Sequence, residues 1–228
     1  FVCIDDKNNK EILQKIKNKN FYTYGLSKNS NFQITKVIQK KFFSQFDLSI
    51  NIPGNNKLIK KIKIPLLGLH NIKNAASAVA VSFSIGITES IIKKALSKFK
   101  GVQRRFNYLF EKNNAIFFDD YAHHPTEIIS MLDGVKKVYK KKEIISVFQP
   151  HRISRVKNMK LEFSKSFINA DTVLLCPIYK ANENLKLGFS YNSFAKLIIK
   201  NSKVKLIYIK NEENLKKFLE QTAYGEKI

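Results

Sequence analysis

The sequence predicts an α/β protein of two domains, the second with a Rossmann-like, mainly parallel sheet. Short apolar runs rich in Val, Ile and Phe alternate with longer segments of helical period, which is typical of strands joined by crossover helices. With 228 residues, 44% of them hydrophobic, the chain is large enough to bury a core in each of two domains. Gly101 interrupts the pattern, so we expect a short hinge near residues 100–102.

Apolar runs rich in β-branched and aromatic residues predict the strands of the first domain, residues 1–100. The expected strands are Phe1–Asp5, Phe21–Tyr24, Phe32–Ile38, Phe46–Ile50 and Ile62–Leu66. The expected helices are Asn9–Lys17, His70–Ile85 and Thr88–Phe99, the last with Thr88 as its N-cap residue.

Residues 101–228 alternate more regularly and predict the second domain. The expected strands are Asn107–Glu111, Ala115–Asp119, Ile144–Phe148, Val173–Pro177 and Val204–Ile209. The expected helices lie near 125–140, 155–168, 191–200 and 212–221. Because strands that alternate with helices favour parallel βαβ units, we interpret this half as Rossmann-like.

Composition argues against several classes of function. The formal charge is +23, but 37 of the 41 basic residues are lysines spread along the chain, whereas specific nucleic-acid recognition depends largely on arginine. We therefore interpret the charge as a solvated surface and expect no specific nucleic-acid partner. Two cysteines are too few for a disulfide framework or a zinc site. The longest apolar run, Ala75–Ile87, is too short to span a membrane.

The few arginines and histidines of this lysine-rich chain gather in four short motifs. They are His70, Arg104, Arg105, His123, His124, His151, Arg152 and Arg155. A guanidinium group donates two parallel hydrogen bonds to a carboxylate or phosphate, which an ammonium group cannot imitate. The arginine pairs therefore indicate binding of an oxyanion.

Two of these motifs follow predicted strands. Asp119 and Asp120 end one strand, where the carboxyl ends of a parallel sheet form a ligand crevice, and a ribose hydroxyl or a metal is the expected partner. His124 falls at a helix N-cap position, so free backbone N–H groups beyond it could bind an anion. Arg152 and Arg155 lie three apart at the start of the next helix and can converge on one anion. The alternative is an ordinary strand-to-helix loop with surface arginines.

Asn71 and Asn74 form a further candidate pair. They lie three apart in the first turn of the helix that begins at His70, so both amides face the same way and could read the polar edge of an adenine ring. Helix capping beside an alanine-rich packing face is the alternative explanation.

The motifs taken together resemble those of the Mur ligases. The similar stretches are Val2–Asp6, Tyr22–Gly25, Gly68–Ala75, Gly101–Phe106, Asp119–Glu127, Phe148–Arg155, Ala170–Val173 and Pro177–Glu183. The resemblance implies that residues 1–100 are the C-terminal part of a central ATP-binding domain and that 101–228 are a C-terminal ligase domain truncated at its end. The Gly-x-x-Gly-Lys-Thr phosphate loop and the Mg²⁺ ligands would then lie upstream of Phe1, so we expect this fragment alone to be inactive.

The resemblance also implies an activity. It is that of a cytoplasmic, ATP-dependent ligase of peptidoglycan precursor synthesis, which joins L-alanine to the lactyl carboxylate of UDP-N-acetylmuramate through an acyl phosphate. The implied ATP-binding residues are Asn71, Asn74, Arg105 and Asp120. The implied substrate pocket consists of Tyr121, His123, His151, Arg152 and Arg155, of which His123, Arg152 and Arg155 are the catalytic candidates.

Two related functions stay open as alternatives. One is a ligase that recycles a whole tripeptide onto the same nucleotide sugar, although the loop Gln149–Arg152 resembles the alanine enzymes more closely. The other is a noncatalytic homologue that binds the nucleotide sugar. One position of the motif Phe148–Arg155 departs from the family pattern, because Ile153 stands where an aromatic residue is usual.

Overall fold

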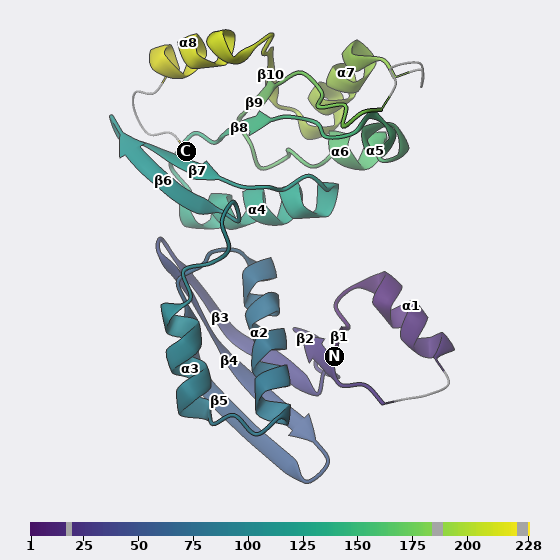
Figure 1. Ribbon diagram of the computed structural model, residues 1–228, viewed down its shortest axis with the longest axis vertical. Coiled ribbons are helices and arrows are strands. Elements are labelled where there is room, and N and C mark those ends of the chain that lie inside the picture. Colours follow the sequence, from purple (N-terminus) through teal and green to yellow (C-terminus); the bar gives the residue numbers. More distant parts are fainter. Residues whose placement is uncertain (17–19, 184–188, 223–227) are drawn as a thin grey trace. The chain divides into compact units, whose positions relative to one another are not determined.

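The computed structural model describes residues 1–16, 20–183, 189–222 and 228, and it divides into two compact units. Unit 1 is Phe1–Gly101 and unit 2 is Val102–Ile228. Each unit contains its own sheet and helices, so the predicted α/β class is confirmed (Figure 1). Among the described helices, none is long and apolar enough to cross a membrane.

Unit 1 contains a five-stranded sheet with the order β1-β2-β3-β4-β5. Its elements are β1 (Val2–Cys3), α1 (Lys7–Lys15), β2 (Thr23–Gly25), β3 (Phe32–Lys40), β4 (Phe43–Ile52), β5 (Asn55–Ile64), α2 (Leu69–Ser84) and α3 (Glu89–Lys98). β1, β2 and β3 are parallel, whereas β3, β4 and β5 form an antiparallel meander. The meander departs from the expected crossover pattern because connections as short as Lys41–Phe42 can join only antiparallel strands.

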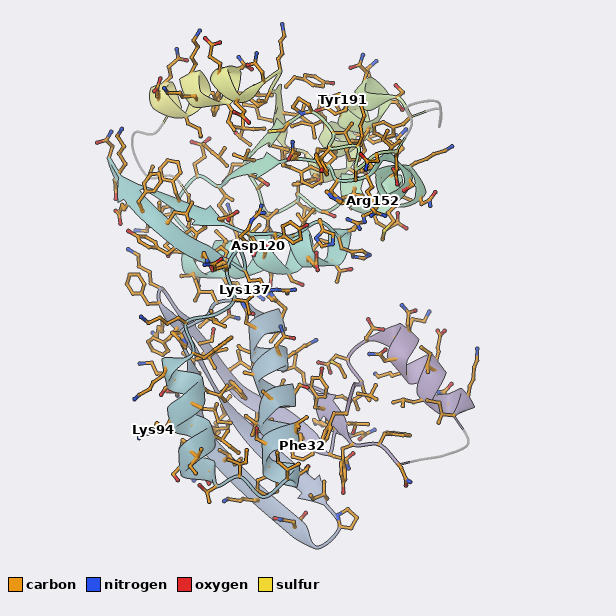
Figure 2. The ribbon with its side chains drawn as sticks, in the orientation of Figure 1. Phe32, Lys94, Asp120, Lys137, Arg152 and Tyr191 are labelled. Carbon is orange, nitrogen blue, oxygen red and sulfur yellow. The ribbon has the colours of Figure 1, made fainter. Side chains whose placement is uncertain are left out.

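Helices α2 and α3 cover one face of this sheet (Figure 1). Phe32, Phe46 and Leu48 from the sheet pack with Val79 and Ala80 of α2 in a core that excludes water. Small side chains along α2 let the helix approach the sheet closely, and burial of the apolar area is the main stabilising contribution. Figure 2 shows Phe32 at this helix–sheet interface.

Unit 2 combines a parallel sheet with a hairpin. Its elements are β6 (Asn107–Lys112), β7 (Ala115–Asp119), α4 (Pro125–Val138), β8 (Ile145–Phe148), α5 (Ile153–Asn158), α6 (Lys160–Ser164), β9 (Thr172–Leu175), α7 (Tyr191–Ser202), β10 (Lys205–Tyr208) and α8 (Glu212–Thr222). The order β10-β9-β8 is wholly parallel, as predicted.

The hairpin formed by β6 and β7 corrects the expected regular alternation of strands and helices. Asn113 and Asn114 join the two strands with φ angles of 51° and 67°. Two consecutive left-handed residues form the tight turn that matches strand twist, and asparagine tolerates that conformation. An Asn-Asn pair between two apolar runs is therefore the sequence signal for the hairpin. In the same unit, the single helix expected near 155–168 is interrupted at Met159, which separates α5 from α6.

Candidate active site

Asp120 fixes the loop that follows β7. Its two carboxylate oxygens accept hydrogen bonds from the N–H groups of Phe106 and Ala122, both at 2.7 Å. Burial raises the pKa of Asp120 above its ordinary value of 3.8, although these two N–H groups favour the charged form. The carboxylate thus holds two backbone segments together. The strand before it belongs to an antiparallel hairpin, which corrects the assumption that Asp119 and Asp120 end a strand of a parallel sheet.

The N-terminus of α4 is capped as the sequence predicts. His124 is the N-cap residue, and its Nδ1 accepts a hydrogen bond from the N–H of Thr126 at 3.3 Å. Glu127 completes a capping box, because its Oε2 accepts from the N–H groups of His123 and His124 at 3.0 and 3.1 Å. Since these side chains already bind several N–H groups, the helix end is less open to an anion than expected.

Arg152 and Arg155 lie at the start of α5, as predicted. Arg152 is the N-cap residue and has a φ of 65°, in the left-handed region. Arg155 lies within the helix and its Nη1 donates to the carbonyl oxygen of His123 at 3.5 Å. The loops that follow β7 and β8 therefore meet, and they bring His123 beside the arginine pair. Figure 2 shows Arg152 and Asp120 at these loops of unit 2.

Four aromatic rings form a continuous row beside the arginines. Tyr121 and His123 make an edge-to-face contact with ring centroids 5.1 Å apart. His123 is followed by His151 at 6.3 Å, and His151 stacks on Tyr179 at 5.2 Å. The two outer rings, Tyr121 and Tyr179, are 51% and 55% exposed, so a bound molecule could contact them.

His151 occupies an unusual position in this row. Its Nδ1 is buried and has no hydrogen-bond partner among the described residues. Burial lowers the pKa of His151 below its ordinary value of 6.5, and the nearby guanidinium groups of Arg155 and Arg152 lower it further. The imidazole is therefore neutral near pH 7 and acts there as a hydrogen-bonding group.

The remaining predicted residues of unit 2 adjoin the same loop. Arg104 pairs with Asp119 at 3.3 Å, and its guanidinium lies 4.8 Å from the centre of the Tyr121 ring. The backbone of Arg104 also accepts a hydrogen bond from the N–H of Tyr121 at 2.7 Å. Arg105 follows directly, and its charge favours the ionised form of Asp120.

Asn71 and Asn74 belong to unit 1, and the structure places their amides in different environments. Asn71 is buried, with an exposed fraction of 6%, and its Nδ2 donates to the carbonyl oxygen of Leu67 at 2.7 Å. Asn74 is exposed. The expectation that the two amides face the same way is not met, because the Leu67 carbonyl before α2 draws the first amide inward. His70, beside them in the first turn of α2, is partly buried.

Three residues beside the predicted cluster were given no role from the sequence: Ser154, Tyr179 and Glu183. Tyr179 stacks on His151, and Glu183 accepts two hydrogen bonds from Ser154. Hydrogen bonds from Ser154 lower the pKa of Glu183 below its ordinary value of 4.5. The segment Pro177–Glu183 was one of the stretches that resemble the Mur ligases, so the signal was present, although no role was assigned to it.

Neither a metal cluster nor the apolar groove explains the polar residues of this site. Within the described parts of the chain, no group of three or more His, Cys, Asp or Glu residues could hold a metal ion. A groove of about 210 Å³ lies beside β7 and β8, but its lining is largely apolar and includes Ile116, Phe118 and Val147. The arginines, histidines and tyrosines described above lie instead at the strand-end loops.

Comparison with known sequences places both units in one family. The profile of the Mur ligase middle domain matches residues 1–82, and the profile of the Mur ligase glutamate ligase domain matches residues 104–226. The chain belongs to the Mur ligase family. This Mur ligase chain is 58% identical over its whole length to a UDP-N-acetylmuramate–L-alanine ligase of Pelagibacter ubique, of which it covers 49%.

Two further relatives agree with this assignment. An enzyme of the same name from Protochlamydia amoebophila is 39% identical over 90% of this chain and 42% of its own length. The crystal structure of a UDP-N-acetylmuramate–alanine ligase from Thermotoga maritima superposes with a TM-score of 0.68 at 26% identity, over 86% of this chain and 41% of that one. The chain thus spans about half the length of the curated relatives that it matches.

Proposed function

We propose that the full-length protein joins L-alanine to UDP-N-acetylmuramate, with hydrolysis of ATP to ADP and phosphate. The observation that carries the proposal is the convergence of Arg152, Arg155, His123 and His151 at the loops after β7 and β8. Two guanidinium groups beside polar rings can donate hydrogen bonds to a carboxylate and stabilise the negative charge that develops as it becomes an acyl phosphate. The names of the most similar relatives support the same reaction.

The proposed reaction has two steps, and both accumulate negative charge. A lactyl carboxylate oxygen attacks the γ-phosphorus of ATP, the bond to the β–γ bridging oxygen breaks, and ADP leaves. The amine of alanine then attacks the acyl carbon, the bond to the phosphate oxygen breaks, and the nitrogen loses a proton. Arg152 and Arg155 would hold and neutralise the carboxylate and phosphate oxygens. His123 would orient the substrate or accept the proton, and Tyr121 and His151 would line the pocket.

Four residues are proposed as candidates for contact with ATP. Asn71 and Asn74 of unit 1 are proposed to recognise the base, and the exposed amide of Asn74 is the better placed of the two. Arg105 and Asp120 of unit 2 are proposed to bind phosphate and ribose. Both Asp120 oxygens already accept backbone N–H groups, so a ribose hydroxyl would share an oxygen with one of them. The family's Mg²⁺ has no candidate ligand cluster among the described residues, and no step is assigned to it.

Phosphate release by the full-length protein tests the proposal. We expect release only when ATP, UDP-N-acetylmuramate and L-alanine are present together, because the acyl phosphate forms on the sugar carboxylate and is consumed by the amine. Replacement of L-alanine by the tripeptide of the peptidoglycan stem tests the recycling ligase, and equal turnover with the tripeptide would assign the protein to that activity. Binding of the nucleotide sugar without any phosphate release would identify a noncatalytic homologue. A cytoplasmic location follows from the proposed substrates, ATP and a nucleotide sugar.

A further inference from the structure

The segment Pro177–Glu183, here called the strap, lies against the loop that carries Arg152. The N–H of Arg152 donates to the carbonyl oxygen of Tyr179 at 2.9 Å, and the N–H of Tyr179 donates to Pro150 at 2.8 Å. These two bonds pair His151 with Tyr179 as an isolated parallel bridge. The strap thus continues the pairing of β8 with β9 beyond the ends of both strands.

Helix α5 lacks a cap from its own N-cap residue. Arg152 occupies that position, and its side chain has no oxygen that could accept the free N–H groups of the first turn. Its φ of 65° is a strained backbone conformation for a residue with a Cβ atom, and the surrounding contacts must offset that strain. An acceptor from elsewhere in the chain would therefore stabilise this helix start.

Glu183, at the end of the strap, supplies the missing acceptors. Its Oε2 accepts from the N–H of Ser154 at 2.9 Å, and its Oε1 accepts from the Ser154 hydroxyl at 2.5 Å. Both oxygens are therefore directed at the helix start. A carboxylate at a helix N-terminus also interacts favourably with the helix dipole. The charge of Arg152 also favours the ionised form of Glu183, so this carboxylate interacts both with the helix start and with the arginine that begins it.

The backbone that leads from β9 into the strap is also anchored. The hydroxyl of Tyr191, at the start of α7, reaches the carbonyl oxygens of Leu175 and Cys176 at 3.1 and 2.6 Å. Burial raises the pKa of Tyr191, so the hydroxyl keeps its proton and remains a donor. Figure 2 shows Tyr191 and Arg152 in unit 2. The strap is fixed to β9 at its start and to α5 at its end.

We propose that Glu183 is a positioning residue, which caps α5 from outside the helix and thereby holds Arg152 and Arg155 in the geometry that binds the reacting oxyanion. The proposal rests on the proposed ligase function for its activity readout. The clamp itself, a pair of hydrogen bonds to Ser154, can be tested without any substrate.

The activity test uses the full-length protein with Glu183→Ala, Glu183→Gln and Ser154→Ala. We expect Glu183→Ala to lower kcat for phosphate release by about tenfold, because a small displacement of the arginines misaligns the reacting groups. The KM for ATP should stay within about twofold, and Glu183→Gln should recover most of kcat because its amide oxygen can still accept from the Ser154 N–H. Glu162→Ala, at an exposed carboxylate in the same unit, is the matched control and should leave turnover unchanged.

A double-mutant cycle separates a clamp from a general loss of structure. If Glu183 acts through Ser154, Glu183→Ala should cost less in kcat when Ser154→Ala is already present. Strictly additive losses, or a loss in kcat that only follows a fall in the folded fraction, would overturn the positioning role.

Amide hydrogen exchange of residues 150–158 measures the clamp in the absence of substrates. We expect Glu183→Ala to speed exchange at Ser154 by about tenfold or more without changing exchange in α7. If the wild type releases no phosphate with UDP-N-acetylmuramate and alanine, the proposed function fails, and faster exchange still supports the clamp. Unchanged exchange overturns the clamp whatever the activity, and faster exchange with wild-type kcat overturns its role in positioning.

Discussion

Arg152 combines a costly backbone conformation with a side chain that the lysine-rich composition would not supply by chance. A φ of 65° is left-handed, where a residue with a Cβ atom is strained and glycine is not. The guanidinium therefore stands at a position whose backbone conformation favours glycine. Backbone strain at a candidate site supports a functional reason for the side chain.

Two substitutions distinguish the effect of the Arg152 backbone strain from the effect of its guanidinium group. Arg152→Lys keeps the charge and the strain but removes the planar fork, and we expect kcat for phosphate release to fall by roughly 10- to 100-fold. Arg152→Gly should abolish turnover and yet raise the free energy of unfolding by about 0.5–1 kcal/mol, because the strain is relieved. Steady-state kinetics and denaturant unfolding measure the two effects. If Arg152→Lys kept the wild-type kcat, the guanidinium of Arg152 would have no role in the proposed reaction.

Asp120 gives a pH-dependent prediction. Its pKa is raised in the folded state. Below about pH 3.8 the carboxyl is protonated in both the folded and the unfolded protein, so it does not lower the free energy of unfolding. As the pH rises above 3.8, the unfolded state loses its proton first, and the unfolding free energy contributed by Asp120 decreases until the folded carboxyl is also ionised. We therefore expect the stability of the wild type relative to Asp120→Asn to decline over this range. Thermal unfolding of both proteins between pH 3.5 and 6 measures the difference, and a relative rise would contradict the burial argument.

At the scale of elements, the sequence predicts what local rules control. The bounds of β7 and the N-cap of α4 agree with expectation, because apolar runs and the His-Pro-x-Glu pattern act within a few residues. The antiparallel pairing of β6 with β7 was missed, although Asn113 and Asn114 carry a local turn signal.

Contacts between distant segments explain what the sequence does not predict about the site. Glu183 lies 29 residues beyond the Ser154 that it binds, and no periodicity connects the two. The inward turn of the Asn71 amide likewise depends on a carbonyl group whose position is set by the fold. The sequence could predict that the candidate site lies in the loops at the strand ends. It could not predict which side chains contact each other across those loops.

The capping box of α4 is an element whose contribution can be measured. Glu127→Ala removes the acceptor for the N–H groups of His123 and His124, so we expect a loss of about 1 kcal/mol in the free energy of unfolding. It should also lower kcat, because the His123 backbone is released. Glu220→Ala is a suitable control, since it removes an exposed ion pair with Lys216 away from the N-terminus of α8 and should cost less than about 0.5 kcal/mol. Equal losses for both variants would argue against the capping role.

At the scale of the whole molecule, the charge of +23 has to be explained alongside the proposed ligase function. Lysines are spread over both units, while all four arginines lie near the strand-end loops of unit 2 or in the segment that leads into them. A surface of this kind attracts polyanions through counterion release, without recognising any sequence. The proposed ligase reaction would use the arginines and the rings beside them instead.

The two explanations of the charge predict different responses to salt. We expect binding to duplex DNA at low ionic strength that weakens steeply as salt increases and is almost lost at about 0.2 M, with equal affinity for unrelated sequences. Phosphate release at about 0.15 M salt should be unchanged by added DNA, because the positive surface and the substrate pocket involve different side chains. Fluorescence anisotropy over a salt series and the phosphate-release assay measure the two quantities. Tight, sequence-dependent binding that persists at high salt would instead show that the lysines form a specific nucleic-acid interface.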